Sequence, residues 1–171
     1  QRQAVVPLVS EAPDVGTGLE EKAARDSGHL IVADRDGTIA RVDAKQIVLR
    51  GRSGAKSFTL NKFKRSNQFT CISQRPVVRM EQKVKRGDVL ADGPSTDNGV
   101  LALGKNLLAA FISWEGANFE DAIIISERVV RENLFSSIHI TDFVCDLRDT
   151  KLVPESTKPD IHNVSEEKLK N

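Results

Sequence analysis

The chain has 171 residues, of which 39% are hydrophobic and 29% charged, and its formal net charge is +1. This length is enough to bury a hydrophobic core, and this composition excludes an intrinsically disordered chain. No apolar run approaches the roughly 18 residues that a membrane span needs, and the first residues lack the charged and apolar blocks of a signal peptide.

The first part of the chain is expected to be irregular. Prolines and glycines interrupt residues 1–28, and only LEEKAARDS (residues 19–27) indicates a short helix. The chain begins with Gln1 rather than Met, and its last residues, SEEKLKN, have a helical composition. We therefore expect the sequence to be a segment of a longer polypeptide.

Short strands are predicted to follow. HLIVAD, TIARVD, QIVLR and SFTLNKF alternate apolar and polar residues, and DRDG, DAK and GRSG separate them. Asp and Gly tolerate the left-handed backbone of tight turns, so these separators predict hairpins. RPVVRMEQKVKRGDVLADGPS (residues 75–95) continues this pattern. The sequence thus predicts a mostly β fold with minor α, either a barrel or a sandwich.

Positive charge is concentrated in the same region. From Arg41 to Arg86 there are 13 Lys or Arg residues against two acids, a local balance of +11, which leaves −10 for the rest of the chain. A basic stretch of this density favours a polyanion such as nucleic acid, or an acidic neighbouring subunit. A solvated basic face is the alternative. Lys62, Lys64 and Arg65 are the candidates for facing nucleic acid.

The second half is predicted to contain three further elements. NLLAAFISW (residues 106–114) is nearly continuous in apolar residues, which predicts a strand buried on both faces. IIISERVVRENLF (residues 123–135) predicts a helix of about two to three turns with Ser126 as its N-cap. SIHITDFVCDLRD (residues 137–149) alternates as a strand, and the polar tail ends in a helix that begins at Ser165.

Most familiar catalytic motifs are absent from the sequence. It contains no P-loop, HExxH, nucleophile elbow, paired CxxC or GxGxxG. Cys71 and Cys145 are far apart in sequence, so we expect two buried thiols in a reducing cytoplasm. His139 lies on the predicted strand, where a structural role is expected.

The sharpest chemical feature is the pair Glu120 and Asp121, which precedes an apolar run. Carboxylate oxygens are the ligands that Mg²⁺ prefers, usually one or two per segment with several waters retained. On an extended backbone the two side chains would face opposite ways, so only one would face an ion squarely. The alternative is that the pair precedes a helix N-terminus, where the helix dipole favours negative charge.

Several motifs together are familiar. QRQAV, VGTGLE, RSNQ, GDVLADGPSTDNGVLALGKN, WEGANFEDAIIISERVV, SIHI and RDTKL occur in this order between Gln1 and residue 152. Together they resemble the β subunit of bacterial DNA-directed RNA polymerase. The resemblance covers essentially the whole chain, and two of the motifs are longer than ten residues.

The resemblance implies part of a double-psi β-barrel with an inserted barrel-sandwich hybrid module. Residues 1–28 would lead into the active-site barrel, and residues 29–95 would form the inserted β-rich module with the basic stretch. Residues 96–150 would return to the barrel with the acidic motif, a short helix and a strand. Residues 151–171 would form a polar tail that continues into further chain.

The resemblance also implies a function, nucleotidyl transfer in transcription. Glu120 and Asp121 would face the second, nucleotide-delivered Mg²⁺ through water, and Gln1, Arg2 and Gln3 would lie near the RNA 3′ end. The primary Mg²⁺ ligands would belong to the β′ subunit. The expected partners are the β′, α and omega subunits, a sigma factor, template DNA, the RNA transcript and NTPs, in the bacterial cytoplasm and associated with the nucleoid.

The resemblance also implies what the segment lacks, and one alternative function stays open. The isolated segment is expected to be inactive, because the primary metal ligands are absent from it. The alternative function is a structural, subunit-docking module of the same assembly with no direct role in chemistry. The sequence also departs from the family pattern, with Phe69 where a small residue is usual and Ala117 where an aromatic residue is usual.

Overall fold

The computed structural model describes residues 4–147, 165, 167 and 168. The chain divides into two compact units, residues 1–141 and residues 142–171. In the second unit the described residues form no helix or strand, and the Lys168 amide donates a hydrogen bond to the Ser165 carbonyl over 3.0 Å. All helices and strands of the described residues therefore belong to the first unit.

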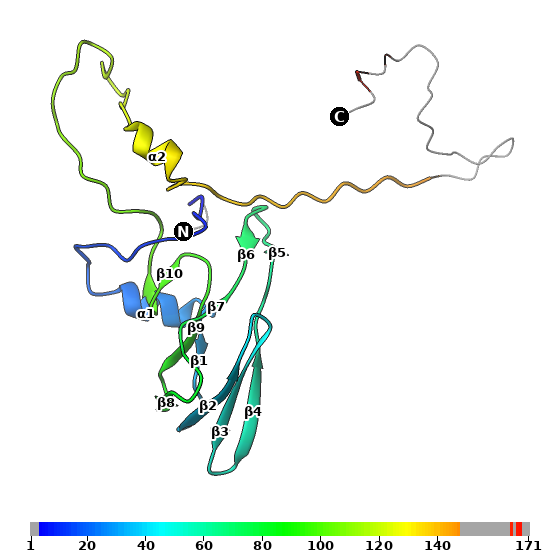
Figure 1. Ribbon diagram of the computed structural model, residues 1–171. Coiled ribbons are helices and arrows are strands. Elements are labelled where there is room, and N and C mark those ends of the chain that lie inside the picture. Colours follow the sequence, from blue (N-terminus) through cyan, green and yellow to red (C-terminus); the bar gives the residue numbers. More distant parts are fainter. Residues whose placement is uncertain (1–3, 148–164, 166, 169–171) are drawn as a thin grey trace, which may run out of the picture. The chain divides into compact units, whose positions relative to one another are not determined.

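The first unit is mostly β with two short helices (Figure 1). In chain order its elements are α1 (Glu20–Asp26), β1 (Ile31–Val32), β2 (Gly37–Val42), β3 (Gln46–Gly51), β4 (Gly54–Thr59), β5 (Lys64–Arg65), β6 (Cys71–Ile72), β7 (Arg75–Pro76), β8 (Lys83–Val84), β9 (Val89–Asp92), β10 (Thr96–Asp97), β11 (Val100–Leu101) and α2 (Glu127–Arg131). The predicted fold class, mostly β with minor α, is confirmed at this level.

The longest strands form two hairpins whose turns were predicted from the sequence. β2 pairs with β3 and β3 with β4, all antiparallel. The Asp43 carboxylate accepts hydrogen bonds from the Lys45 and Gln46 amides, both 2.8 Å, and so closes the first turn. In the second turn Gly51 pairs with Gly54, and Gly54 takes φ +108°, which favours glycine. Short-range turn chemistry thus sets the register of this sheet.

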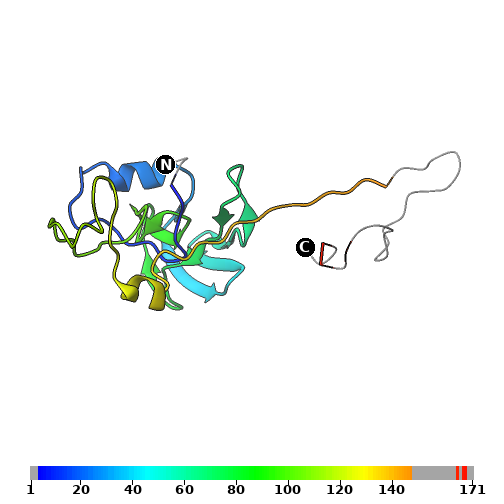
Figure 2. The same cartoon turned by 90° about the horizontal axis from the view of Figure 1, so that it is seen from above.

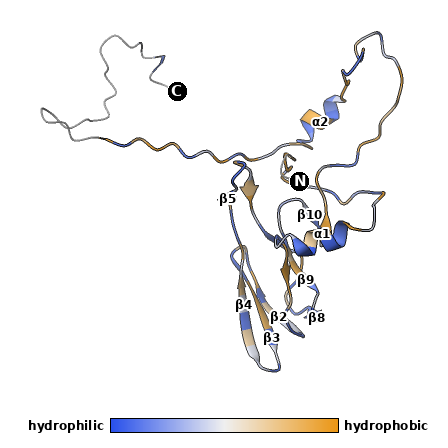
Figure 3. Cartoon of the chain, turned by 180° about the vertical axis from the view of Figure 1, so that it is seen from behind, coloured by the Kyte–Doolittle hydropathy of each residue, from blue (hydrophilic) through white to orange (hydrophobic). Residues whose placement is uncertain are grey.

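Two sheets share one core. The order β4-β3-β2-β8 forms the larger sheet and β1-β9-β7 the smaller, with β5-β6 and β10-β11 as separate pairs. Ile39, Ile47 and Leu49 from the larger sheet and Leu90 and Ala91 from β9 belong to one buried cluster. Figure 3 shows apolar residues on these strands, and also along the loop that leads to α2. Helix α1 lies on the far side, against β11, with the smaller strands between it and the long hairpins (Figure 2).

A buried glutamine ties three segments together. Gln74 accepts a hydrogen bond from the Asn61 amide through Oε1 and donates one to the His29 carbonyl through Nε2, both 2.8 Å. The adjoining Gly93 approaches the same carbonyl so closely that a Cβ would lie 2.4 Å from that oxygen. Because a buried amide must be hydrogen-bonded, Gln74 fixes how the chain enters β7.

The structure corrects two predicted strands. Residues 106–114 form no strand and are exposed, because no other described segment provides a layer against which they could be buried. From residue 137 to residue 147 the only pairing among described residues is a bridge between His139 and Thr70. Apolar and polar residues do alternate in this segment, but no described strand pairs with it beyond this bridge.

Smaller predictions were also tested. The helix at residues 19–27 is confirmed as α1, and α2 has Ser126 as its N-cap but only five residues, shorter than expected. The expectation of two buried thiols is wrong, because Cys71 is half-buried and Cys145 exposed, both free. Among the described residues no helix is long and apolar enough to span a bilayer. The double-psi and barrel-sandwich features and the domain boundaries stay predictions.

Candidate functional site

The predicted acidic pair lies on an extended loop. We call residues 105–135 the acidic arm; it follows β11 and includes α2. Most of its large apolar side chains are exposed, among them Leu108, Phe111, Phe119 and Ile123. The arm therefore contains little packing of its own, and short-range hydrogen bonds shape it.

One side chain organises the bend before the acidic pair. Asn118 Oδ1 accepts a hydrogen bond from the Trp114 amide over 2.9 Å, and Asn118 Nδ2 donates to the Ile112 carbonyl over 2.6 Å. The Ala117 amide also donates to the Trp114 carbonyl over 2.8 Å. Asn118 thus closes a loop whose end presents Glu120.

Glu120 has an unusual backbone conformation. Its φ is +62°, and the Ala122 amide donates to the Phe119 carbonyl over 3.3 Å, so Glu120 is the first central residue of a tight turn. Glycine is the usual residue with positive φ at that position. Because the backbone turns here, the extended arrangement considered from the sequence does not apply. A non-glycine residue in this region costs about 1–3 kcal/mol, and such strain is frequent at functional sites.

The two carboxylates face a groove with apolar walls. Glu120 and Asp121 are the charged residues that line this groove, which has a volume of about 830 Å³. Phe111, Ile112 and Trp114 form part of its walls. Both acids are exposed, and no described residue makes a hydrogen bond or ion pair to either carboxylate. Their oxygens remain available for water, a cation or another chain.

The acidic pair fits a supporting role toward a metal ion better than a complete metal site. Within the described residues no group of three or more His, Cys, Asp or Glu side chains could hold an ion. Two carboxylates match the oxygen preference of Mg²⁺, which keeps several waters when few protein ligands are present. The donor set therefore fits water-mediated contact, with any inner-sphere ligands supplied from elsewhere.

The helix-capping alternative does not fit the geometry. Ser126 accepts a hydrogen bond from the Arg128 amide through Oγ over 3.2 Å and is the N-cap of α2. Glu127 supplies the acidic residue of the first turn. Because the dipole effect falls off within one turn, Glu120 and Asp121 lie too early in the chain to benefit from it.

The structure describes only some of the other predicted site residues. Gln1, Arg2 and Gln3 lie outside the described residues. Lys62 is half-buried, and its Nζ donates to the Gln74 carbonyl over 2.8 Å. Lys64 and Arg65 are exposed on β5, and Arg65 lies over the Phe69 ring at 5.3 Å. The structure does not bring these cations to the acidic pair.

Phe69, one of the departures from the family pattern, lies in a tight turn. It follows the RSNQ motif and has φ +64°, in the left-handed region. Small residues, above all glycine, adopt this region at least cost. The turn also contains a hydrogen bond of 2.6 Å between the Ser66 and Thr70 hydroxyl groups. A small residue is usual here because the backbone has a positive φ. Phe69 adopts the same backbone conformation, and its ring makes a cation–π contact with Arg65.

Sequence reasoning missed the connection at the root of the acidic arm. Lys105 Nζ lies 2.7 Å from Glu11 Oε1, and its side chain is only 10% exposed. The Asn106 amide donates to the other Glu11 oxygen, and Asn106 Nδ2 donates to the Ala12 carbonyl. The hydrogen bond from Lys105, followed by that from Asn106, lowers the pKa of Glu11 below its ordinary value of 4.5. No local pattern signals a contact between residues this far apart in sequence.

Comparison with known proteins identifies relatives over the whole chain. The sequence model of the family RNA polymerase Rpb2, domain 6, matches residues 32–171. A DNA-directed RNA polymerase subunit beta from Caldicellulosiruptor bescii is 56% identical over 172 residues, which is 100% of this chain and 14% of that protein. The protein with the same name from Erythrobacter litoralis is 56% identical over 178 residues, 100% of this chain and 13% of that protein. The chain thus spans about one seventh of the length of these relatives.

Proposed function

This chain belongs to the RNA polymerase Rpb2 domain 6 family, and we propose that it serves as a segment of a bacterial RNA polymerase β subunit that takes part in nucleotidyl transfer. The observation that carries the proposal is the exposed pair Glu120 and Asp121, which has no side-chain partner among the described residues and lies on a strained turn beside a groove. Identity of 56% across the chain supports the assignment to the subunit.

In the proposed reaction the RNA 3′-hydroxyl attacks the α-phosphate of an incoming NTP and pyrophosphate leaves. Mg²⁺, when bound, neutralises charge on the triphosphate. Glu120 and Asp121 would hold water molecules of the ion's hydration shell and so orient the triphosphate, with primary ligands supplied by the β′ subunit. Asn118 would position the turn, because it fixes the backbone on which Glu120 lies.

The basic residues and the first residues would contact nucleic acid. Gln1, Arg2 and Gln3 would lie near the RNA 3′ end. Lys64 and Arg65 are exposed on β5 and would face phosphate groups, while Lys62 has one hydrogen bond to the protein and further N–H groups to donate. Contacts of this kind make binding weaken steeply as salt rises.

The finer fold assignment is part of the same proposal. Residues 29–95 would be the inserted barrel-sandwich hybrid module and the flanking residues part of a double-psi barrel. Two sheets around one core support this. So does the turn before β9, where the Lys85 amide donates to the Asp88 carboxylate over 2.8 Å.

The assembled enzyme would contain the β′, α and omega subunits and would bind a sigma factor, template DNA and NTPs. The isolated 171-residue chain would not catalyse the reaction, because the primary metal ligands would come from the β′ subunit. The contribution of this segment to nucleotidyl transfer would require the other subunits of the assembled enzyme.

The test is an Asp121→Asn variant of the assembled polymerase, with Glu115→Gln as the matched control. Glu115 is another exposed acid on the acidic arm, with φ +49°, but it does not line the groove. We expect Asp121→Asn to raise the Mg²⁺ and NTP concentrations needed for half-maximal rate by about 10- to 100-fold, as expected for lost outer-shell support. Unchanged Mg²⁺ dependence in Asp121→Asn, or an equal change in Glu115→Gln, would contradict the proposal.

A second function is favoured by one observation, the exposed apolar surface of the acidic arm. Fully exposed Leu108 and Phe111 and largely exposed Ile123 are typical of a surface that another chain segment covers. In that case the segment would dock subunits and have no direct role in chemistry. Under this alternative, Leu108→Asp would prevent assembly, whereas Asp121→Asn would leave the Mg²⁺ requirement unchanged.

A further inference from the structure

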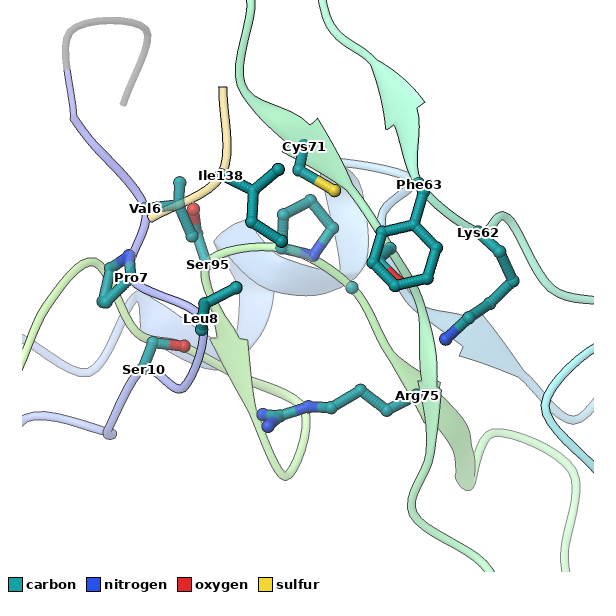
Figure 4. A pocket seen from close by; sticks show the side chains of 13 residues that line it. Val6, Pro7, Leu8, Ser10, Lys62, Phe63, Cys71, Arg75, Ser95 and Ile138 are labelled. Carbon is teal, nitrogen blue, oxygen red and sulfur yellow. The ribbon is translucent and has the colours of Figure 1, made fainter. Parts of the chain in front are cut away.

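A second pocket lies away from the acidic arm. It has a volume of about 310 Å³ and is lined by parts of residues 6–10, 62–75 and 93–95 together with Ile138 (Figure 4). Ligand pockets in proteins measure about 300–1,000 Å³, so this one suits a small molecule. Its walls come from distant parts of the sequence, which tertiary structure alone brings together.

The pocket contains positive charge without a counter-ion. Arg75 and Lys62 line it, and no Asp or Glu does. Lys62 donates to the Gln74 carbonyl, whereas the Arg75 guanidinium makes no hydrogen bond or ion pair with any described residue. Arg75 is half-buried, so part of its hydration is lost without replacement. An anion in the pocket would restore that loss, and a guanidinium binds a carboxylate through two parallel hydrogen bonds.

The opposite side of the pocket is mostly apolar, although Ser95 also lies there. In Figure 4 Val6, Cys71 and Ile138 lie along one side of the pocket, while Arg75 and Lys62 reach in from the other, below the Phe63 ring. Charged and apolar groups are therefore separated within one small cavity. This separation matches a ligand that has an anionic end and an apolar body.

Two strained residues contribute to the same pocket. Phe63 has φ +49° and Ser95 has φ +59°, both in the left-handed region. Phe63 is 63% exposed, so burial in the core does not account for its position. Strained non-glycine residues cluster at ligand-binding sites. Lys62 Nζ lies over the Phe63 ring, 5.7 Å from its centroid, so a flat ring would stack on the other aromatic face.

We propose that this pocket binds a small aromatic carboxylate, with its carboxylate on Arg75 and its ring against Phe63 and Pro94. A bare inorganic anion would leave the apolar wall unused, and a neutral aromatic molecule would leave Arg75 without a counter-ion. The site is separate from the acidic pair and does not depend on the role proposed for that pair.

The test uses the assembled polymerase with full-length β subunit and the probe 4-(trifluoromethyl)benzoate, followed by ligand-observed fluorine NMR. The neutral 4-(trifluoromethyl)benzamide is the matched ligand control. Arg75→Met removes the charge with little change in length, and Arg79→Met is the matched protein control, because Arg79 is exposed and does not line the pocket. We expect saturable binding of the benzoate that weakens at least tenfold in Arg75→Met and is unchanged in Arg79→Met.

Phe63→Ala is the second variant, because it leaves the charge in place and removes an exposed side chain. It should also weaken benzoate binding several-fold. The proposal is wrong if the unmodified enzyme shows no saturable binding, if the benzamide binds as tightly as the benzoate, or if Arg75→Met and Arg79→Met bind equally well.

Discussion

The two sheets and the acidic arm use similar apolar sequences in opposite ways. In QIVLR of β3, Ile47 and Leu49 are fully buried, whereas in NLLAAFISW of the arm, Leu108 and Phe111 are fully exposed. The apolar side chains of β3 pack in a cluster with residues of β2, β8 and β9 of the same chain. Apolar composition alone therefore does not predict whether a segment is buried by the rest of the chain.

The chain spans only a small part of its relatives' length, and the sheets and the acidic arm differ in how far they are buried within it. The chain covers 14% of the Caldicellulosiruptor bescii protein, so most of that relative has no counterpart in these 171 residues. The sheets complete a core within residues 29–101. The arm, in contrast, presents a strained acidic turn and an apolar surface that are both suited to a larger assembly.

The largest expected effect comes from a matched pair of leucines. Leu49→Ala should lower the free energy of unfolding of the chain by about 2–5 kcal/mol, because it leaves a cavity in the shared core. Leu108→Ala should change it by less than about 0.5 kcal/mol, because that side chain is already in water. Urea unfolding followed by circular dichroism measures both values.

The single tryptophan provides an internal control for that comparison. Trp114 lies on the acidic arm and is exposed, so its fluorescence should already be that of solvated indole before the core unfolds. A Trp114 emission change that coincides with the core transition, or a Leu108→Ala loss as large as that of Leu49→Ala, would show that the arm packs on the sheets.

A smaller effect is expected at the Glu11–Lys105 pair, which joins the first residue of the acidic arm to the segment before α1. The folded pKa of Glu11 is lowered, chiefly by the hydrogen bond from Lys105, so this contact stabilises the fold above pH 4.5 and the stabilisation is lost as pH falls through the lowered value. Lys105→Met should move the Glu11 pKa back toward 4.5. Carboxyl chemical shifts in an NMR pH titration measure this. An unchanged Glu11 pKa in Lys105→Met would show that Lys105 does not lower it.

Much of the sheet region could be predicted from the sequence because its determinants are local. Asp43 follows β2 and Gly54 begins β4, in turns whose chemistry is visible in DAK and GRSG. Ser126 was identified as the N-cap from its residue type within the predicted helical stretch. The role predicted for the acidic pair stays a prediction, although the structure places both acids on one groove. Each of these depends on residues a few positions apart.

The rest depends on contacts across long sequence separations. The Glu11–Lys105 pair, the Gln74 hydrogen bonds and the Arg75 pocket each join distant segments, so no periodicity reveals them. The strand predicted at residues 106–114 was wrong for the same reason, since its burial requires a layer that no other described segment supplies. The positive φ of Glu120 was missed because glycine, the usual signal, is absent there.

We propose that Glu120 and Asp121 lie beside the Mg²⁺ that arrives with the nucleotide. The most direct measurement replaces Mg²⁺ with Fe²⁺ in the assembled, RNA-extending enzyme and maps where the iron-generated hydroxyl radicals cleave the β-subunit backbone. We predict cleavage around residues 118–123 that rises when the matching NTP is added, while the β2–β4 hairpins stay intact. Cleavage that never reaches residues 118–123, or that ignores the nucleotide, would contradict the claim.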